Sequence, residues 1–179
     1  MLIIGLGYRA RQGKKLGSDT IQEACANREI EARIYEFSAE VSAYCVEYGL
    51  FADAAPRDRK TLEVLQRVGL EMRQQDPTFW INRLWGRLRA DSPQVALIPN
   101  LRFPNEAERV KADGGACVLV ERFNADGSQY IDPDRDPNSS FENALRAWPW
   151  DYRLAARSGQ SAWLCTQARA LFRHLRCAE

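Results

Sequence analysis

A short apolar strand that runs into a loop of glycines and cations opens the chain, and it constrains the fold more than any other feature. Residues 2–6 are apolar, and the sequence GLGYRARQGKKLGS occupies residues 5–18. The polar residues Ser18, Asp19 and Thr20 predict a helix start directly after the loop, with the helix running from about Asp19. Glycines let successive backbone N–H groups face one point, lysine adds a mobile positive charge, and a helix N-terminus adds unsatisfied amides. This order predicts an anion site, and nucleotide phosphate is its natural ligand.

The loop meets the phosphate-loop pattern G-x-x-x-x-G-K-[ST] only in part. Gly13 and Lys14 match its glycine and lysine, whereas Tyr8 stands at the first glycine position and Lys15 at the position of Ser or Thr. The alternative is a glycine-rich turn that only connects a strand to a helix. Because glycines and cations gather so closely here, we favour a phosphate site over a plain turn.

Composition limits the class of protein. The chain has 179 residues, of which 45% are hydrophobic, so it can bury one core, and we expect a single domain over residues 1–179. Its 25 basic residues nearly balance its 24 acidic residues, which argues against a nucleic-acid or anionic-membrane partner. The five cysteines lack metal-site spacing and His174 is the only histidine, which excludes zinc sites and histidine-based triads. No segment resembles a signal peptide or a membrane span, which predicts a cytoplasmic protein.

Strands and helices alternate along the rest of the chain, as in an α/β protein with a parallel sheet covered on both faces. Apolar runs predict further strands at residues 30–37, 94–99 and 116–120. Helical signals predict helices at residues 19–27, 39–48, 60–73 and 161–177, one that starts at residue 76, and one that opens within residues 100–106 and closes at the glycines 114–115. Residues 123–140 are rich in Asp, Pro, Asn, Gly and Ser, and we expect a surface loop that acts as a lid.

The most specific motif is RFPNEA at residues 102–107, followed by the glycine pair 114–115. Together with LQRVGLEMR at residues 65–73, DPTFW at residues 76–80 and the N-terminal loop, it resembles phage-type deoxynucleoside monophosphate kinases over nearly the whole chain. The resemblance implies a three-layer P-loop kinase-like fold, ATP and Mg²⁺ as cofactors, and nucleotides as substrates. It leaves a homodimer open, and it implies the host cytoplasm as the location if the protein is phage-encoded.

The resemblance also implies site residues. The ATP-binding residues would be Gly7, Arg11, Gly13, Lys14, Ser18, Asp19 and Thr20, and Thr20 would also hold the metal. The residues that bind the acceptor nucleotide would be Gln66, Gly69, Leu70, Arg73, Trp80, Asn100 and Arg102. The catalytic cations would be Lys14, Lys15, Arg102, Arg122 and Arg135. Arg102 carries the most weight, because the carboxyl edge of a parallel strand is where open α/β sheets bind ligands.

Several of these residues also have plainer interpretations. Trp80 fits the core of an amphipathic helix, and Arg102 fits a cation at a helix start that pairs with Glu106. Arg135 lies between two aspartates and fits a solvated charge of the loop.

The chain departs from the family pattern at four places. Residues 15–18 separate Lys14 from the Asp-Thr pair that follows directly in that family, and these extra residues could displace the loop from the helix amides by several ångströms, since a chain spans at most ~3.3–3.6 Å per residue. Either the loop reorganises, with Lys15 and Ser18 sharing the work, or ATP binding is weakened. Leu70 stands in place of threonine, and Asn100 in place of aspartate. The family stretch His-x-Ser-Glu reads SSFE at residues 139–142 and keeps only its glutamate, Glu142.

Three functions stay open at this point. The leading hypothesis is ATP-dependent phosphorylation of a deoxynucleoside monophosphate to the diphosphate. The four departures motivate a second, a non-catalytic descendant that binds nucleotide or a protein partner. A third transfers the phosphoryl group to a modified base or to nucleic acid, and the balanced charge counts against it.

Overall fold

The computed structural model describes residues 1–51 and 59–177, and internal contacts divide the chain into two compact units. The sheet unit comprises Met1–Ile34 together with the chain from Pro93 onward, and the helical unit comprises Tyr35–Ser92. The single domain expected from chain length stays a prediction.

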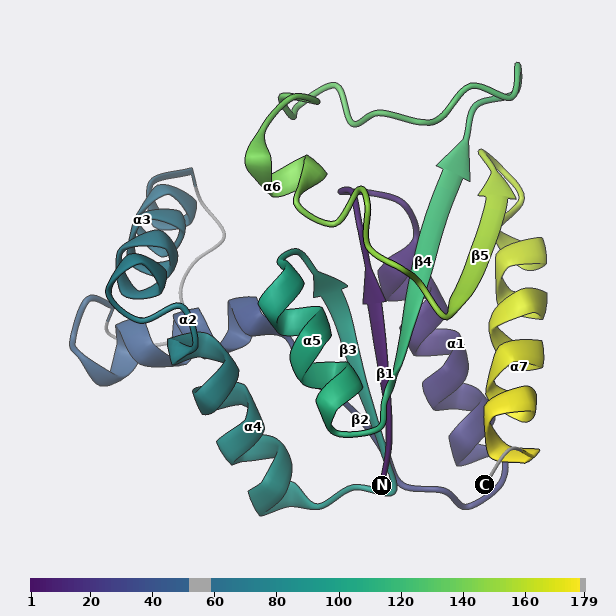
Figure 1. Ribbon diagram of the computed structural model, residues 1–179, viewed down its shortest axis with the longest axis horizontal. Helices are drawn as coiled ribbons and strands as arrows, with labels where there is room; N and C mark the ends of the chain where they lie inside the picture. Colours follow the sequence, from purple (N-terminus) through teal and green to yellow (C-terminus); the bar gives the residue numbers. More distant parts are fainter. Residues whose placement is uncertain (52–58, 178–179) are drawn as a thin grey trace. The chain divides into compact units, whose positions relative to one another are not determined.

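A five-stranded parallel sheet forms the centre of the sheet unit, with the strand order β2-β3-β1-β4-β5 (Figure 1). The strands are β1 (Leu2–Gly7), β2 (Ala32–Ile34), β3 (Val95–Leu101), β4 (Ala116–Phe123) and β5 (Tyr152–Arg157). The central strands β1 and β3 are almost entirely buried, as parallel strands covered on both faces must be. The predicted strands at residues 2–6, 94–99 and 116–120 are therefore confirmed, each with a longer carboxyl end.

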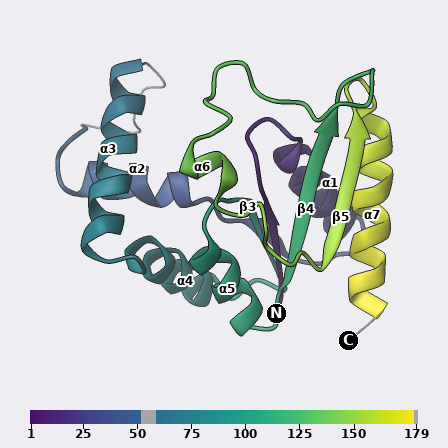
Figure 2. The ribbon, with the colours of Figure 1, turned by 45° about the horizontal axis from the view of Figure 1, so that its top comes forward.

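Helices cover both faces of this sheet (Figure 1, Figure 2). On one face lie α1 (Lys14–Ala26) and α7 (Ser161–Cys177), which also pack against each other, and on the other lies α5 (Pro104–Ala112). Ile21 of α1 and Phe172 of α7 are fully buried in the core on the first face. The result is the predicted three-layer α/β arrangement.

The helical unit contains α2 (Phe37–Glu47), α3 (Arg59–Gln75) and α4 (Phe79–Asp91). Trp80 of α4 is its central side chain: it is 2% exposed, and its indole Nε1 donates to the Gly69 carbonyl at 2.9 Å. The rings of Tyr44 and Phe79 meet the Trp80 ring edge to face. Arg87 of α4 also donates to the buried Glu40 of α2.

The prediction that a helix begins at Asp19 is wrong, because α1 begins at Lys14. Gly13 takes a left-handed backbone with φ 102°, and the Gly17 amide donates to the Gly13 carbonyl at 2.9 Å, which closes the first helical turn. The residues that appeared to separate the loop from the helix therefore form this first turn. The backbone amides of the helix start stay beside the loop, and the expected displacement does not occur.

Two further differences concern short elements. Residues 30–37 do not form one extended segment, since β2 is limited to Ala32–Ile34 and α2 begins at Phe37. β5 and the four-residue α6 (Ser140–Asn143) have no counterpart among the predicted elements. β5 is an edge strand with only one buried side chain, Leu154, so it lacks the continuous apolar run that marks the central strands.

Candidate functional site

The loop between β1 and α1 has the turned backbone of an anion-binding loop although its sequence departs from the motif. Tyr8, Arg11 and Gly13 have φ values of 89°, 52° and 102°. Tyr8 stands where the motif has glycine, and it adopts a left-handed conformation that glycine favours. A bulky residue rarely holds such a backbone, and residues that do so cluster at functional sites. The tyrosine therefore changes the side chain at this position without straightening the loop.

Lys14 is the first residue of α1, and its side chain turns back into the loop. The residue is 4% exposed, and Nζ donates to the Tyr8 carbonyl at 3.3 Å and to the Arg9 carbonyl. The pKa of Lys14 is lowered from 10.5 to about 7, chiefly by burial and then by the nearby Arg102, with a smaller contribution from Arg135 and an opposing one from Glu142. The ammonium thus lies in a nearly dry site where cations outnumber carboxylates.

Arg102 follows β3, at the same edge of the sheet as the loop after β1. Its Nη1 donates to Glu142 Oε1 at 3.1 Å, and only 22% of its side chain is exposed. Burial lowers the pKa of Arg102, and Glu142 counteracts that effect. Glu106, the partner expected from sequence, accepts a hydrogen bond from the backbone N of Arg102 at 2.8 Å.

Glu142 of α6 is a central residue of this site to which the sequence assigned no role. The residue is 5% exposed, and its Oε2 accepts a hydrogen bond from the Ala10 amide of the loop at 2.9 Å. The same carboxylate accepts from Arg102, so it joins the loop after β1 to the end of β3. In the sequence, the one signal for a role of Glu142 was that it is the residue kept from the family stretch His-x-Ser-Glu.

The segment after β4, residues 124–143, is bound to the loop between β1 and α1 rather than projecting away from it. Arg9 donates to the side-chain oxygens of Gln129 and Asn143, at 3.1 and 3.0 Å. Arg11 forms ion pairs with Asp132 and Asp134, at 3.2 and 3.1 Å. Arg135, in the same segment, lowers the pKa of both Lys14 and Arg102, which places its charge within electrostatic range of them.

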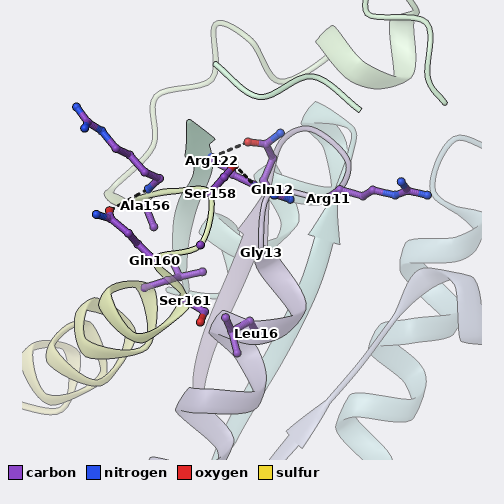
Figure 3. Close-up of a pocket in the computed structure, with 12 residues that line it drawn as sticks. Arg11, Gln12, Gly13, Leu16, Arg122, Ala156, Ser158, Gln160 and Ser161 are labelled. Atoms are coloured by element: carbon purple, nitrogen blue, oxygen red, sulfur yellow. Dashed lines mark hydrogen bonds between the residues drawn. The ribbon is translucent and has the colours of Figure 1, made fainter. Parts of the chain in front are cut away.

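Gln12 and Arg122 border a pocket of about 250 Å³ beside the loop (Figure 3). The buried Gln12 accepts a hydrogen bond from the Arg122 amide at 2.6 Å and donates to the Tyr130 carbonyl at 3.0 Å. The Arg122 guanidinium donates to Ser158 and lies 4.2 Å from the centroid of the Tyr130 ring. The residues that line the pocket are Arg11, Gln12, Gly13, Leu16, Arg122, Ala156, Arg157, Ser158, Gly159, Gln160, Ser161 and Leu164.

Four of the predicted phosphate and metal ligands do not point into the loop. Lys15 is exposed and forms an ion pair with Asp19 at 2.7 Å, one turn along α1. The Ser18 hydroxyl donates to the Lys15 carbonyl, and the Thr20 hydroxyl donates to Cys165 of α7 at 3.2 Å. With both hydroxyls turned away, these residues do not fit a Mg²⁺ ion bound at the loop. Within residues 1–51 and 59–177, no group of three or more His, Cys, Asp or Glu could hold a metal.

Gly7 and Asn100 lie at the ends of the neighbouring strands β1 and β3. A Cβ at Gly7 would lie 2.4 Å from the Trp150 ring, so packing requires glycine there. The strand register steps from Leu6 opposite Pro99 to Gly7 opposite Leu101, which leaves Asn100 in a bulge with φ 74°. Asparagine is among the residues that tolerate this conformation best.

The remaining predicted acceptor residues belong to the helical unit. Trp80 lies in its core, as its plainer interpretation had it, with its indole N–H bonded to Gly69. Gln66 and Leu70 are exposed on α3, and Arg73 is half-buried near its end. Contact with a ligand stays a prediction for all of them.

Comparison with known proteins identifies the fold. No family model matches the chain, and no curated protein matches its sequence. Solved structures match it over nearly its whole length: shikimate kinase from Aquifex aeolicus has a TM-score of 0.52 at 12% identity and covers 99% of this chain and 100% of its own. Shikimate kinase from Acinetobacter baumannii in complex with shikimate has a TM-score of 0.52 at 13% identity, with 97% and 94% covered.

A putative kinase from Chloroflexus aurantiacus has a TM-score of 0.52 at 11% identity and covers 99% of this chain and 97% of its own. The chain has the three-layer α/β fold of P-loop kinases. At such low identities the similarity extends to the fold alone. No helix in the described part of this P-loop kinase fold is long and apolar enough to cross a membrane.

Proposed function

We propose that this chain is an ATP-dependent kinase that phosphorylates a deoxynucleoside monophosphate to the diphosphate. One observation carries the proposal: the buried Lys14 ammonium and the Arg102 guanidinium lie beside one loop with a left-handed backbone, whose Ala10 amide already binds a carboxylate, at the carboxyl edge of a parallel sheet. Fixed positive charge in a site with little water is what phosphoryl transfer requires, because the transition state spreads negative charge over the phosphoryl oxygens. The resemblance of residues 65–80 and 102–107 to phage-type kinases supports the acceptor class.

Each cation has a role in this mechanism. Lys14 contacts the β- and γ-phosphates of ATP, and Arg102 with Arg135 neutralises the charge of the transferring group and the acceptor phosphate. The phosphate of a nucleoside monophosphate is already an anion near neutral pH, so transfer to it needs no general base. The acceptor contacts proposed for the helical unit are Gln66, Gly69, Leu70 and Arg73.

The pocket beside Gly13 is the proposed site for the ATP base. It adjoins the first turn of α1, so a nucleotide with its phosphates at Lys14 has its base within reach of the pocket. The volume of about 250 Å³ is small and suits a planar ring. Arg122 offers a flat cation at its wall, already stacked on Tyr130.

Mg²⁺ enters this proposal only as an ion that accompanies ATP, where it would neutralise phosphate charge. The hydroxyls of Ser18 and Thr20 are engaged within the fold, so no step here depends on a metal held by the protein. The same observation favours the second candidate, a descendant that binds nucleotide without transferring phosphate. A homodimer and a cytoplasmic location also stay predictions.

A coupled ADP-release assay across the four deoxynucleoside monophosphates, with calorimetric titration of ATP in parallel, separates the two candidates. A kinase is expected to release ADP with at least one acceptor and to bind ATP. Binding of ATP without ADP release favours the descendant, and the absence of both contradicts the two candidates together.

The affinity for ATP should decrease as the pH rises above 7. Lys14 has a pKa of about 7 in the folded protein, so it is charged below this pH and loses its charge above it. Because a phosphate binds only the charged form well, each pH unit above the pKa should weaken binding by up to about tenfold. Calorimetry between pH 7.5 and 9 measures this slope. A Lys14→Arg variant, whose cation does not titrate in this range, should show a flat profile, and a flat profile in the parent would contradict the assignment.

Filling the base pocket should weaken ATP binding without affecting a ligand that has no base. Ser161 is exposed at the start of α7 and lines the pocket, so a Ser161→Trp variant places a ring there without disturbing the core. We expect the dissociation constant for ATP to rise about tenfold, and that for inorganic pyrophosphate to stay the same. Ser161→Ala is the matched control. An equal loss of affinity for ATP and for pyrophosphate would contradict the placement of the ATP base in this pocket.

A further inference from the structure

A buried carboxylate lies among the cations of the phosphate site, where the proposed mechanism has no use for a negative charge. Glu142 is 5% exposed and bonds to both the Ala10 amide and the Arg102 guanidinium. It also acts on Lys14, whose charge it favours against the effects of burial, Arg102 and Arg135. Glu142 therefore balances part of the positive charge when no ligand is bound.

The two groups that bind Glu142 are donors that suit a phosphoryl group equally well. A loop amide and an arginine fork bind carboxylate and phosphate oxygens with the same geometry. A phosphoryl group at these donors would bring its charge against the carboxylate in a site with little water, where repulsion between like charges is strong. The two anions therefore exclude each other.

We propose that Glu142 is an internal occupant of the phosphoryl seat formed by the Ala10 amide and the Arg102 guanidinium, and that a bound phosphate group displaces it. This inference rests on the proposed function and adds a residue that sets the affinity of the site for its ligand. Removing the competing charge should strengthen phosphate binding, whereas a residue that merely orients Arg102 would weaken binding when replaced.

Displacement of Glu142 does not require the whole segment after β4 to open. Arg9 holds Gln129 and Asn143, and Arg11 holds Asp132 and Asp134, through contacts that do not involve the carboxylate of Glu142. A rotation of the Glu142 side chain can vacate the seat while these contacts keep the segment in place.

Calorimetric titration of inorganic pyrophosphate into the parent protein and a Glu142→Gln variant tests the proposal. Pyrophosphate carries no base or sugar, so it reports on the phosphate seat alone. The titration is made at pH 6 and repeated at pH 5, because losing Glu142 lowers the pKa of Lys14, which is about 7 in the parent. Glutamine preserves the size of the side chain and one acceptor oxygen, replaces the other oxygen with an NH2 donor, and removes the charge. We expect the variant to bind pyrophosphate about tenfold more tightly.

A charge-matched control shows whether any gain is specific to the seat. Asp126→Asn removes one negative charge from the same segment, at an exposed carboxylate that hydrogen-bonds with Ser128. This variant should bind pyrophosphate as the parent does. Equal gains in both variants would overturn the proposal, because net charge alone would then explain them.

Unchanged or weaker binding by Glu142→Gln also overturns the proposal, as does the absence of pyrophosphate binding in both parent and variant. If that variant fails to fold, Glu142→Asp provides the test. The shorter aspartate side chain cannot reach both the Ala10 amide and the Arg102 guanidinium, so this variant should also bind pyrophosphate more tightly than the parent. A protein that transfers phosphate but shows no gain refutes this inference alone. A gain in a protein that transfers no phosphate refutes the proposed function alone.

Discussion

Replacing Lys14 with methionine is expected to lower turnover by about 10²- to 10³-fold, the usual loss when one preorganised donor to a developing charge is removed. The ammonium lies inside the loop, bonded to the carbonyls of Tyr8 and Arg9, so no neighbouring side chain replaces it at this position. Lys15 points away and pairs with Asp19. Steady-state ADP release measures the effect.

The same variant should be more stable than the parent near neutral pH. The folded-state pKa of Lys14, about 7, lies below the 10.5 of the free side chain, so below pH 7 folding pays the full cost of a buried charge. Between about pH 7 and 10.5, Lys14 is neutral in the folded protein and still protonated in the unfolded chain, so this cost falls as the pH rises through that range. Methionine removes the cost, so the melting temperature should rise while activity falls, a trade-off typical of functional sites.

Lys111→Met is the matched control for both measurements. Lys111 pairs with Asp151 at 2.6 Å on the surface of the sheet unit, away from the loop. Its replacement should leave turnover unchanged and should not raise the melting temperature. A Lys14→Met protein with parental turnover, or one that melts below the parent, would contradict the assignment of Lys14.

Replacing Arg102 with methionine should have the opposite effect on stability and again abolish most activity. Glu142 would keep its buried carboxylate without the guanidinium, and leaving a buried charge unpaired costs about 3–5 kcal/mol. We therefore expect the free energy of unfolding to fall by about 3 kcal/mol in urea denaturation. Turnover should fall at least about 10²-fold, because the transferring group loses a fixed positive charge.

A double variant separates these two effects. Arg102→Met combined with Glu142→Gln removes the unpaired charge, so most of the lost stability should return while turnover stays low. A double variant as unstable as the single one would show that Arg102 contributes through packing rather than through its pair with Glu142. A double variant with restored turnover would remove Arg102 from the mechanism.

The positions of Lys14 and Arg102 show which part of the site could be predicted from the sequence. Both were assigned to the site from their position, one after a glycine-rich loop and one after an apolar strand, and the structure places both at one edge of the sheet, with Glu142 between Arg102 and the loop. Parallel strands bring their carboxyl ends to the same edge, so a residue that follows such a strand can be placed without coordinates. Their roles in catalysis stay proposals.

The start of α1 shows where sequence reasoning failed. The polar residues Ser18, Asp19 and Thr20 looked like a helix start, but Gly13 in the left-handed conformation lets the helix begin at Lys14. The start of α1 is thus set by the backbone conformation of Gly13 and not by a side-chain cap. The error changed the expected site, because a helix that begins at Lys14 directs the Thr20 hydroxyl to Cys165 of α7.

The amino-acid sequence by itself determined the alternation of strands and helices, the glycine-rich loop and the residues at the strand ends, because each of these depends on neighbours within a few positions of the chain. Only the tertiary structure decided that Glu142 lies against Ala10, 132 residues away, that Trp80 is buried against Gly69, and that the segment after β4 is tied to Arg9 and Arg11. Such contacts depend on how distant parts of the chain pack, and local patterns of polarity carry no information about them.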